Sequence, residues 1–386
     1  MNRKTILRPI IMMFAAGLII MLNGCTQTNY TYGVVGRPAV SVDGQYVTVL
    51  VAESKGITRQ VNGGYRNTTY SSSYWLKVYE TASGKLVKKK KIVSDAEERR
   101  ILPVCYGGYK DKIWLLTTKL TAYSITSLEE MVNEEQLITN NAFNKKEFPD
   151  DGRFINEAVA DGYIDFRATS GQTYRIDLNN LKISSEKDAI KNKAAAVNQQ
   201  NRLMNELRPV YGVRCDTVNG KMYILAANSN TAIKSNPNNS DNEPIYKKMY
   251  LFTASYTLSS YNNHHFFKNS NLQQCSGTNY LNPIFLKDFA TGKVIYLKKP
   301  GLYAILHNDS LSNNTKSILT AIDEQNNTIW QINTGLGTHI SNCSEANKYC
   351  LITGNRQNII APHLGSDMLC VINLYTGSMI TPSIAD

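Results

Sequence analysis

Short stretches of alternating apolar and polar residues, separated by turns rich in Gly, Asn, Asp and Ser, run along most of this chain. Alternation with a period of two residues indicates half-buried β-strands. Six stretches join two such strands through a polar turn: 76–87, 120–131, 173–184, 285–296, 319–330 and 370–381. Gly, Asn and Asp at these turns permit the positive φ angles or side-chain bonds that a tight reversal needs. The pattern predicts a chain built mainly of β-hairpins.

The hairpins recur at intervals that indicate a repeat. Their turns are centred near residues 84, 128, 181, 292, 327 and 377, about 35 to 53 residues apart except for one gap of 111. The stretch 249–261 can supply the unit missing from that gap, and another short strand precedes most hairpins. Four-stranded units repeated about every 40–50 residues are typical of a β-propeller. We expect an all-β propeller of about seven blades, with six or eight as alternatives, closed by pairing of 32–42 with 367–377.

Two stretches depart from the alternation. Residues 188–208 are rich in Ala, Lys, Gln, Asn and Leu, and apolar residues from Ile190 to Met204 recur at helical spacing. This predicts an amphipathic helix inserted between blades, which serves either packing or the docking of a partner. Residues 229–248 cluster Asn, Ser and Pro and predict a long loop.

The N-terminus has a different pattern, with basic residues followed by an apolar run. Arg3, Lys4 and Arg8 precede the run, which extends roughly from Ile10 to Leu22. That length is short of the about 20 residues that a membrane-spanning helix needs. A basic start, a short apolar run and small residues at its end describe a secretory signal peptide.

The end of this run, Leu22-Asn23-Gly24-Cys25, resembles the lipobox of bacterial lipoproteins. The resemblance implies that residues 1–24 are removed and that Cys25 is acylated. A polar tether over 25–31 would then precede a propeller domain over 32–386. Thr26 stands where an Asp would imply the inner membrane, so the resemblance favours the periplasmic face of the outer membrane. If Cys25 is acylated, two or more acyl chains suffice to hold the protein stably on the membrane. The alternative is that the N-terminal apolar run stays uncleaved and anchors the protein as a helix.

Charge and cysteine content add two expectations. The formal net charge of +11 suits anionic head groups or an acidic protein face, and nucleic acid is not expected for an exported lipoprotein. The four lysines at 88–91 are interpreted as a solvated edge strand, with a binding patch as the alternative. Six cysteines follow Cys25, and Cys343 and Cys350 flank a short polar turn. This pair is the candidate disulfide, with buried free thiols as the alternative.

The stretch 319–335 resembles the repeat of quinoprotein-like propellers, a PQQ-like or WD40-like architecture. Ala321-Ile322-Asp323 ends one strand, Asn326-Asn327 forms the turn, and Trp330 lies in the next strand. A lipid-anchored propeller is similar in plan to the BamB family of outer-membrane lipoproteins and to many uncharacterised propeller lipoproteins. The resemblance implies a protein-binding scaffold and assigns no individual contact residue.

Signatures of catalysis are absent from the sequence. The adjacent cysteines that accompany the quinone in quinoprotein dehydrogenases do not occur, nor do G-x-S-x-G, H-E-x-x-H or a Gly-rich phosphate loop. The adjacent His264 and His265 would point to opposite faces of a strand and make a poor metal site. We therefore expect no catalytic residue, cofactor or metal.

The expected function is a monomeric, non-catalytic scaffold that binds another envelope protein. Tyrosine is common at interfaces, and Tyr65, Tyr256, Tyr261 and Tyr280 lie in stretches expected to be contact loops. The alternative is a periplasmic enzyme or small-ligand binder that uses the central cavity of the propeller. Ionisable side chains grouped at one mouth of the ring would favour this alternative.

Overall fold

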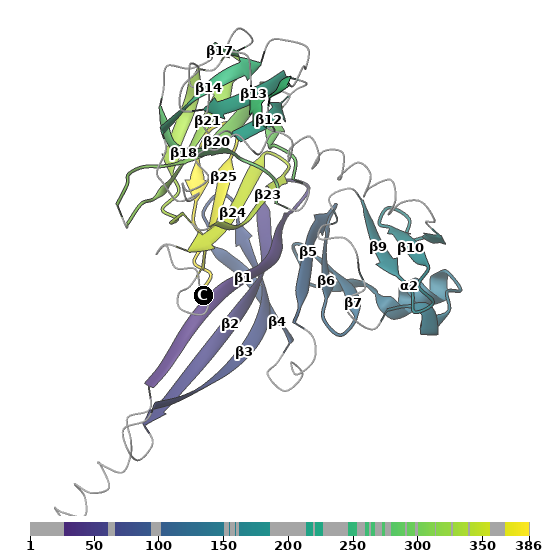
Figure 1. The fold of residues 1–386 in the computed structure, drawn as a ribbon. Helices are drawn as coiled ribbons and strands as arrows, with labels where there is room; N and C mark the ends of the chain where they lie inside the picture. The colour runs from purple at the N-terminus through teal and green to yellow at the C-terminus, as the bar shows by residue number, and fades with distance from the viewer. Residues whose placement is uncertain are drawn as a thin grey trace, which may run out of the picture.

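The fold was obtained as a computed structural model. The structure describes residues 27–60, 66–93, 102–149, 154, 159, 162–185, 214–218, 221–226, 246–252, 259–261, 264–266, 272–274, 279–289, 292–297, 300–312, 314–325, 327–338, 340–355 and 367–385. Within these ranges the strands form six sheets (Figure 1). The expected all-β class is therefore confirmed, whereas the number of propeller blades stays a prediction.

Three sheets come from the N-terminal half of the chain. The first is the meander β1 (Gln27–Val40), β2 (Tyr46–Gln60), β3 (Arg66–Glu80) and β4 (Leu86–Val93). The second is the meander β5 (Val104–Tyr109), β6 (Lys112–Leu116), β7 (Leu120–Ser124) and β8 (Glu130–Asn133). The third contains β9 (Tyr163–Arg167), β10 (Thr173–Asp177) and β11 (Ile183–Ser185).

The other three sheets follow in the C-terminal half. The nine-stranded sheet contains β12 (Arg214–Val218), β13 (Lys221–Ala226), β14 (Tyr246–Phe252), β17 (Leu272–Gln274), β18 (Tyr280–Phe285), β19 (Tyr296–Leu297), β20 (Leu302–Asn308), β21 (Ser317–Asp323) and β22 (Thr328–Asn333). A two-stranded sheet contains β15 (Ser259–Tyr261) and β16 (His264–Phe266). The last is the meander β23 (Ile340–Ala346), β24 (Tyr349–Asn355), β25 (Asp367–Asn373) and β26 (Met379–Ile380).

The predicted hairpins are confirmed. Five correspond to the antiparallel pairs β3–β4, β7–β8, β10–β11, β21–β22 and β25–β26. The stretch 285–296 leaves β18 and returns through a bridge between Lys287 and Val294. Gly84, Gly292 and Gly377 take φ angles near +70° at their turns, as the sequence pattern requires. Such left-handed backbone is open to glycine at no steric cost.

The first sheet is unusually long, and its far end forms an arm. Figure 1 shows the ends of β1, β2 and β3 projecting away from the other sheets. Gln27 pairs with Thr58 there, and the Thr58 hydroxyl lies 2.9 Å from that of Thr68 on β3. The tether expected over 25–31 is thus strand from Gln27 onward, because these alternating Thr and Tyr residues pair with β2.

The first sheet lies between the second and the last sheets of the chain. Leu50 and Leu76 pack with Ile113 of the second sheet, whereas Val47 packs with Leu351 of the last. These contacts place the first and the last of the described sheets side by side.

The closing pair expected between 32–42 and 367–377 is wrong. In the described residues β25 pairs with β24 and β26, and β1 pairs with β2 alone. The two segments meet instead through the backbone N–H of Val34, which donates to Asp367 Oδ2 at 2.9 Å.

The described residues contain one α-helix, α2 (Glu134–Asn140), which the alternating pattern did not predict. Asn133 and Gln136 form a reciprocal capping box at its start, a signal that the sequence did carry. The helix expected near 188–208 lies outside the described residues. None of the described helices is long and apolar enough to cross a membrane.

The 3₁₀-helix η1 (Lys145–Glu147) follows α2. The edge-strand interpretation of the lysines at 88–91 is confirmed, because β4 ends its sheet among the described residues and these lysines are exposed or half-buried.

Candidate functional site

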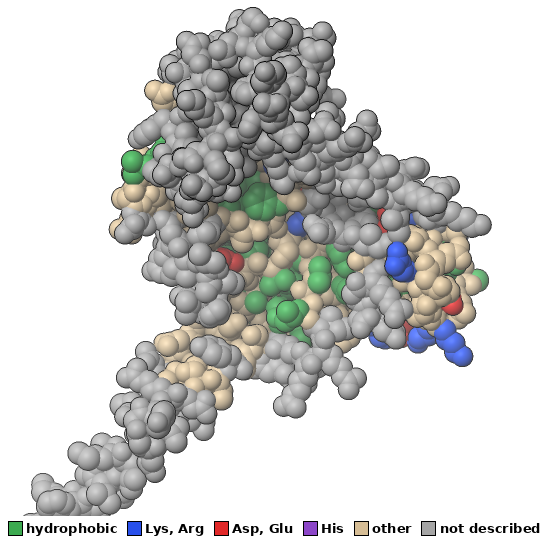
Figure 2. Space-filling model, viewed as in Figure 1, with side chains coloured by type: hydrophobic (Ala, Val, Ile, Leu, Met, Phe, Trp, Pro, Cys, Tyr) green, Lys and Arg blue, Asp and Glu red, His purple; other side chains and the backbone are tan. Residues whose placement is uncertain are grey.

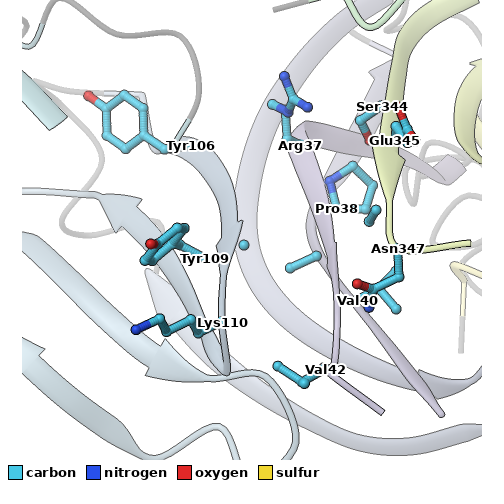
Figure 3. Close-up of a pocket in the computed structure, with 13 residues that line it drawn as sticks. Arg37, Pro38, Val40, Val42, Tyr106, Tyr109, Lys110, Ser344, Glu345 and Asn347 are labelled. Atoms are coloured by element: carbon cyan, nitrogen blue, oxygen red, sulfur yellow. The ribbon is translucent and has the colours of Figure 1, made fainter. Parts of the chain in front are cut away.

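A groove of about 220 Å³ lies where β1, β5 and β23 meet (Figure 3). We call it the β1 groove; it is lined by Arg37, Pro38, Ala39, Val40, Val42, Tyr106, Gly108, Tyr109, Lys110, Ser344, Glu345, Ala346 and Asn347. Figure 3 shows β1 residues along its middle, β5 on one side and β23 on the other. Figure 2 shows hydrophobic side chains gathered on this face, over β1 and β5.

A bulge in β1 shapes the middle of the groove. Val35 pairs with Leu50 and Ala39 with Thr48, so three residues of β1 stand opposite one residue of β2. Bulges redirect side chains, and proline within a sheet is confined to edges and bulges because it lacks an N–H. Pro38 fits this position, and the bulge directs Arg37 out of the ladder.

Glycines allow β1 and β5 to approach closely. Gly36 has a φ of +65°, and a Cβ there would lie 2.3 Å from the carbonyl oxygen of Cys105. A Cβ on Gly108 would lie 2.7 Å from the Cβ of Ala39. Larger residues would force the strands apart, so these glycines fix the width of the groove between β1 and β5.

Arg37 forms a buried ion pair with Asp288, which lies just after β18. Its Nη1 donates to Asp288 Oδ1 at 2.8 Å and its Nη2 donates to Oδ2, and both side chains are 8 % exposed. Asp288 Oδ2 also accepts the backbone N–H of Glu345 at 3.3 Å. The carboxylate thereby connects the bulge of β1 with β23.

Glu345 and Ser344 form one end of the groove. Loss of water around the carboxyl, followed by the charge of Asp288, raises the pKa of Glu345 above its usual value, although the residue as a whole is exposed. Ser344 is 2 % exposed, and its hydroxyl has no hydrogen-bond partner among the described residues. A buried polar group without a partner costs about 1–3 kcal/mol. Because Ser344 and Glu345 are adjacent on β23, the buried hydroxyl and the exposed side chain of Glu345 lie on opposite faces of the strand.

Two hairpin turns form the other end. Lys110 has a φ of +53° in the β5–β6 turn, and its Nζ lies 5.7 Å from the ring centroid of Tyr109. The Tyr109 hydroxyl donates to Asn179 Oδ1 at 2.8 Å. Asn347, with a φ of +55° in the β23–β24 turn, donates to the carbonyl oxygen of Ser41 at 3.1 Å. These bonds hold both turns in place and leave a cationic side chain at this end.

The lining of the β1 groove combines apolar and charged side chains. It contains no histidine or cysteine, and its arginine is held by Asp288. Among the described residues, no three His, Cys, Asp or Glu side chains come close enough together to hold a metal. The middle of the groove is apolar, with Pro38, Val40 and Val42, and its ends carry opposite charges. An extended peptide segment has the shape and mixed character that match this lining.

Among the described residues, the lining of the β1 groove includes none of the candidate contact tyrosines. Tyr65 and Tyr256 lie outside the described residues, as does Cys25, and Tyr261 ends β15. Tyr280 was expected in a contact loop, and this is wrong: it lies in β18 and is 3 % exposed. Its ring is 5.0 Å from that of His307 and belongs to an apolar cluster, so packing accounts for its position.

The candidate disulfide residues lie close together in the core. Cys343 and Cys350 are both fully buried free thiols, and their sulfur atoms are 3.7 Å apart. A hydrogen bond with Cys343 and burial raise the pKa of Cys350 well above its usual value. The disulfide itself stays a prediction.

The residues of the groove were missed because their signal is weak in the sequence. A Gly-Arg-Pro triplet inside an alternating stretch indicates a bulge, and this signal was available at 36–38. The distant partner Asp288 and the neighbouring Ser344 gave no local signal. No family model and no curated protein sequence matches the chain.

Proposed function

We propose that this chain is a non-catalytic lipoprotein of the cell envelope that binds another envelope protein through the β1 groove. The observation that carries the proposal is the groove itself, a trough with a mixed polar and apolar lining and charged ends, framed by three sheets and braced by the Arg37–Asp288 ion pair. Val42 is 62 % exposed and presents apolar surface at its rim. A rigid, preformed surface of this kind loses little conformational entropy when a partner binds to it.

A propeller-like ring is the scaffold in this proposal. Three of the six sheets are four-stranded meanders, which is the form of a propeller blade. The first sheet packs against both the second and the last, as the first blade of a closed ring would. The inner strands β1, β5 and β23 line the groove, so the groove corresponds to part of a central channel.

In this proposal the lipid anchor determines where in the cell envelope the protein lies. Cys25 precedes Gln27 by two residues, and Gln27 begins β1 at the end of the arm. The arm from Gln27 to Val34 spans about 25 Å at roughly 3.3 Å per residue. An anchored Cys25 would therefore hold the groove away from the periplasmic face of the outer membrane, within reach of another envelope protein.

A site-specific crosslinking experiment tests the function. A photo-crosslinking amino acid replaces Val42 in the groove or, as a matched control, Ile329, which is 49 % exposed on β22. We expect the Val42 variant, and not the Ile329 variant, to capture one envelope protein from intact cells. Equal capture at both positions, or none at Val42, would contradict the proposal.

The proposed lipid anchor is tested by a separate experiment. Mass spectrometry of the mature N-terminus is expected to find acylated Cys25, and Cys25→Ala is expected to release the protein from membranes. An unmodified Cys25 or an intact Met1 would show that the protein has no lipid anchor at Cys25. This result would not bear on binding by the groove, which the crosslinking experiment tests.

The second candidate function is an enzyme or small-ligand binder that uses the same cavity. The observation in its favour is the pair of neighbouring carboxyl groups of Asp288 and Glu345, with the raised pKa of Glu345. Paired titratable groups of this kind carry acid–base chemistry in many sites. However, Arg37 holds Asp288, and 220 Å³ is below the range of about 300–1,000 Å³ that is usual for small-molecule sites. Saturable binding of a small metabolite by the pure protein would favour this candidate.

A further inference from the structure

The end of the arm that projects from the other sheets has basic residues and no acidic ones (Figure 1). We call this end the arm tip and define it by three paired segments: 27–31 of β1, 54–60 of β2 and 66–72 of β3. Its charged residues are Lys55, Arg59 and Arg66. Residues 61–65, which join β2 to β3 in the sequence, are uncharged as well. Three formal charges of one sign are thus gathered at one end of the sheet.

Lys55 and Tyr30 give the arm tip an aromatic and cationic surface. The two residues are partners in the β1–β2 ladder, and the Lys55 Nζ lies 6.0 Å from the ring centroid of Tyr30. Tyr30 is 48 % exposed and Lys55 is half-buried. The acidic residue Glu53 lies opposite Tyr32, nearer the base of the arm. Tyrosine rings and basic side chains are the groups that proteins place at the head groups of a membrane.

The chain enters the arm tip directly after the segment that carries the membrane signal. Cys25 precedes Gln27 by two residues, at most about 7 Å of extended chain. Gln27 pairs with Thr58, and Arg59 and Arg66 belong to the next two rows outward. An acylated Cys25 and an uncleaved apolar run would both place a membrane at this end of the arm. The basic rows of the tip are therefore where the described chain would meet that membrane.

The lysines of β4 lie too far from that end to share the contact. Lys91 pairs with Trp75, in the row that contains Val51 and Val34. Val34 follows Gln27 by seven residues, which is about 23 Å at roughly 3.3 Å per residue. Charges act on a lipid surface only within about one Debye length, about 8 Å at physiological salt. An arm that stands on its tip thus keeps the β4 lysines out of reach of the head groups.

We propose that the arm tip contacts the anionic lipid head groups of the membrane surface, with Lys55, Arg59 and Arg66 supplying the charge and Tyr30 the aromatic contact. This inference rests on the proposed position of the protein on a membrane and adds an orientation to it. A lipid at Cys25 holds the protein near the surface, and the tip makes the arm stand upright on it. The β1 groove is then held off the membrane by the length of the arm.

Vesicle binding by the unacylated protein tests this contact. The full mature chain with Cys25→Ser is sedimented with mixed vesicles of phosphatidylglycerol and phosphatidylcholine, or with vesicles of phosphatidylcholine alone. We expect binding to the anionic vesicles only, and weaker binding as the salt concentration rises. Equal binding to both kinds of vesicle would overturn the inference, because a contact made by charge requires anionic lipid.

Two triple variants of this protein separate the arm tip from the overall positive charge. Each removes three charges from the first sheet: Lys55→Gln, Arg59→Gln and Arg66→Gln in the tip, or Lys88→Gln, Lys89→Gln and Lys91→Gln at exposed positions of β4. Each cation close to an anionic surface raises affinity about fivefold, so the tip variant should lose at least about twentyfold. The β4 variant should lose less than about threefold. Equal losses, or a larger loss in the β4 variant, would overturn the inference.

A tryptophan at the arm tip gives a measurement that leaves the charges intact. Tyr30→Trp places it at the tip, and Tyr375→Trp is the matched control, because Tyr375 is 46 % exposed just after β25. Brominated lipid in the anionic vesicles should quench the fluorescence added at residue 30 and spare that added at residue 375. Equal quenching at both positions, or none at residue 30, would contradict the contact.

These experiments separate the failure of this inference from the failure of the proposed function. Acylation of Cys25 and capture by the Val42 crosslinker are measured on their own. If the unacylated protein binds no anionic vesicles, the inference is overturned while both of those results stand. If the tip binds vesicles and Val42 captures no protein, the proposed function fails and the lipid contact stands.

Discussion

The guanidinium of Arg37 and the carboxylate of Asp288 form a buried, two-pronged ion pair between residues 251 positions apart in the sequence. Arg37 lies in the bulge of β1, near the beginning of the described chain, and Asp288 follows β18. Because Asp288 also accepts the N–H of Glu345, one carboxylate connects the first sheet, the nine-stranded sheet and the last sheet. The ion pair thereby connects β1 and β23, two of the three strands that line the groove.

Breaking this pair should strongly destabilise the protein. Asp288→Asn leaves a buried guanidinium without its counter-charge, and such losses cost about 3–5 kcal/mol. The double variant Arg37→Met with Asp288→Leu removes both charges and should recover most of that loss. Urea unfolding followed by circular dichroism measures both. Lys119→Gln breaks the exposed pair with Glu135 and should leave the midpoint nearly unchanged. A double variant no more stable than Asp288→Asn would contradict this account.

Gly36 should tolerate no side chain. In Gly36→Ala the left-handed conformation alone costs about 1–2 kcal/mol. The new Cβ would also lie 2.3 Å from the Cys105 carbonyl oxygen and push β1 away from β5. Gly292→Ala is the control, because Gly292 has nearly the same φ of +67° with nothing within 4 Å of the added Cβ. We expect a clearly larger fall in the unfolding midpoint for Gly36→Ala. Equal falls would show that close packing at Gly36 is unimportant.

His307 should make the protein less stable in weak acid. It is 8 % exposed, its Nε2 lies 2.9 Å from the Thr320 hydroxyl, and burial lowers its pKa below the usual 6.5. Between that lowered pKa and about 6.5 the unfolded chain binds more protons than the folded chain, so the free energy of unfolding falls as the pH falls. Each unit of pKa shift corresponds to about 1.4 kcal/mol. In urea titrations from pH 7 to pH 5, His307→Gln should lose less stability than the wild type; identical losses would contradict the assignment.

The sulfur atoms of Cys343 and Cys350 should become joined when the protein is exported. They are 3.7 Å apart, and an eight-residue loop would gain about 2–3 kcal/mol from a disulfide before any strain is subtracted. Strain is expected, because the two residues are diagonal rather than directly opposite on β23 and β24. Mass spectrometry of non-reduced peptides from protein purified from the envelope should find the linked pair. Complete alkylation of both thiols after unfolding without reductant would show that they stay free.

The sequence determined the local structure well. Alternation and turn residues located the hairpins, and Gly84, Gly292 and Gly377 lie at left-handed turn positions as expected. Each of these features is set within about ten residues of chain, by φ preferences and by side-chain period. The same local rules carried a signal for α2 in Asn133 and Gln136, and one for the bulge in Gly36-Arg37-Pro38. By contrast, Leu128 and Leu181 take φ angles of +57° and +61° without any preference of their own for that region.

The tertiary structure decided how the sheets meet and therefore where the site lies. Arg37 could have paired with any of the acidic residues in the chain, and the approach of the sheets selected Asp288. Tyr280 is polar enough for an interface, yet its place in β18 buries it beside His307. β25 pairs with β24 and β26 in the last sheet, whereas β1 pairs with β2 in the first, although the alternation of both segments allowed them to pair with each other. Partner choice among distant sheets depends on packing and desolvation of residues hundreds of positions apart, and no local pattern encodes it.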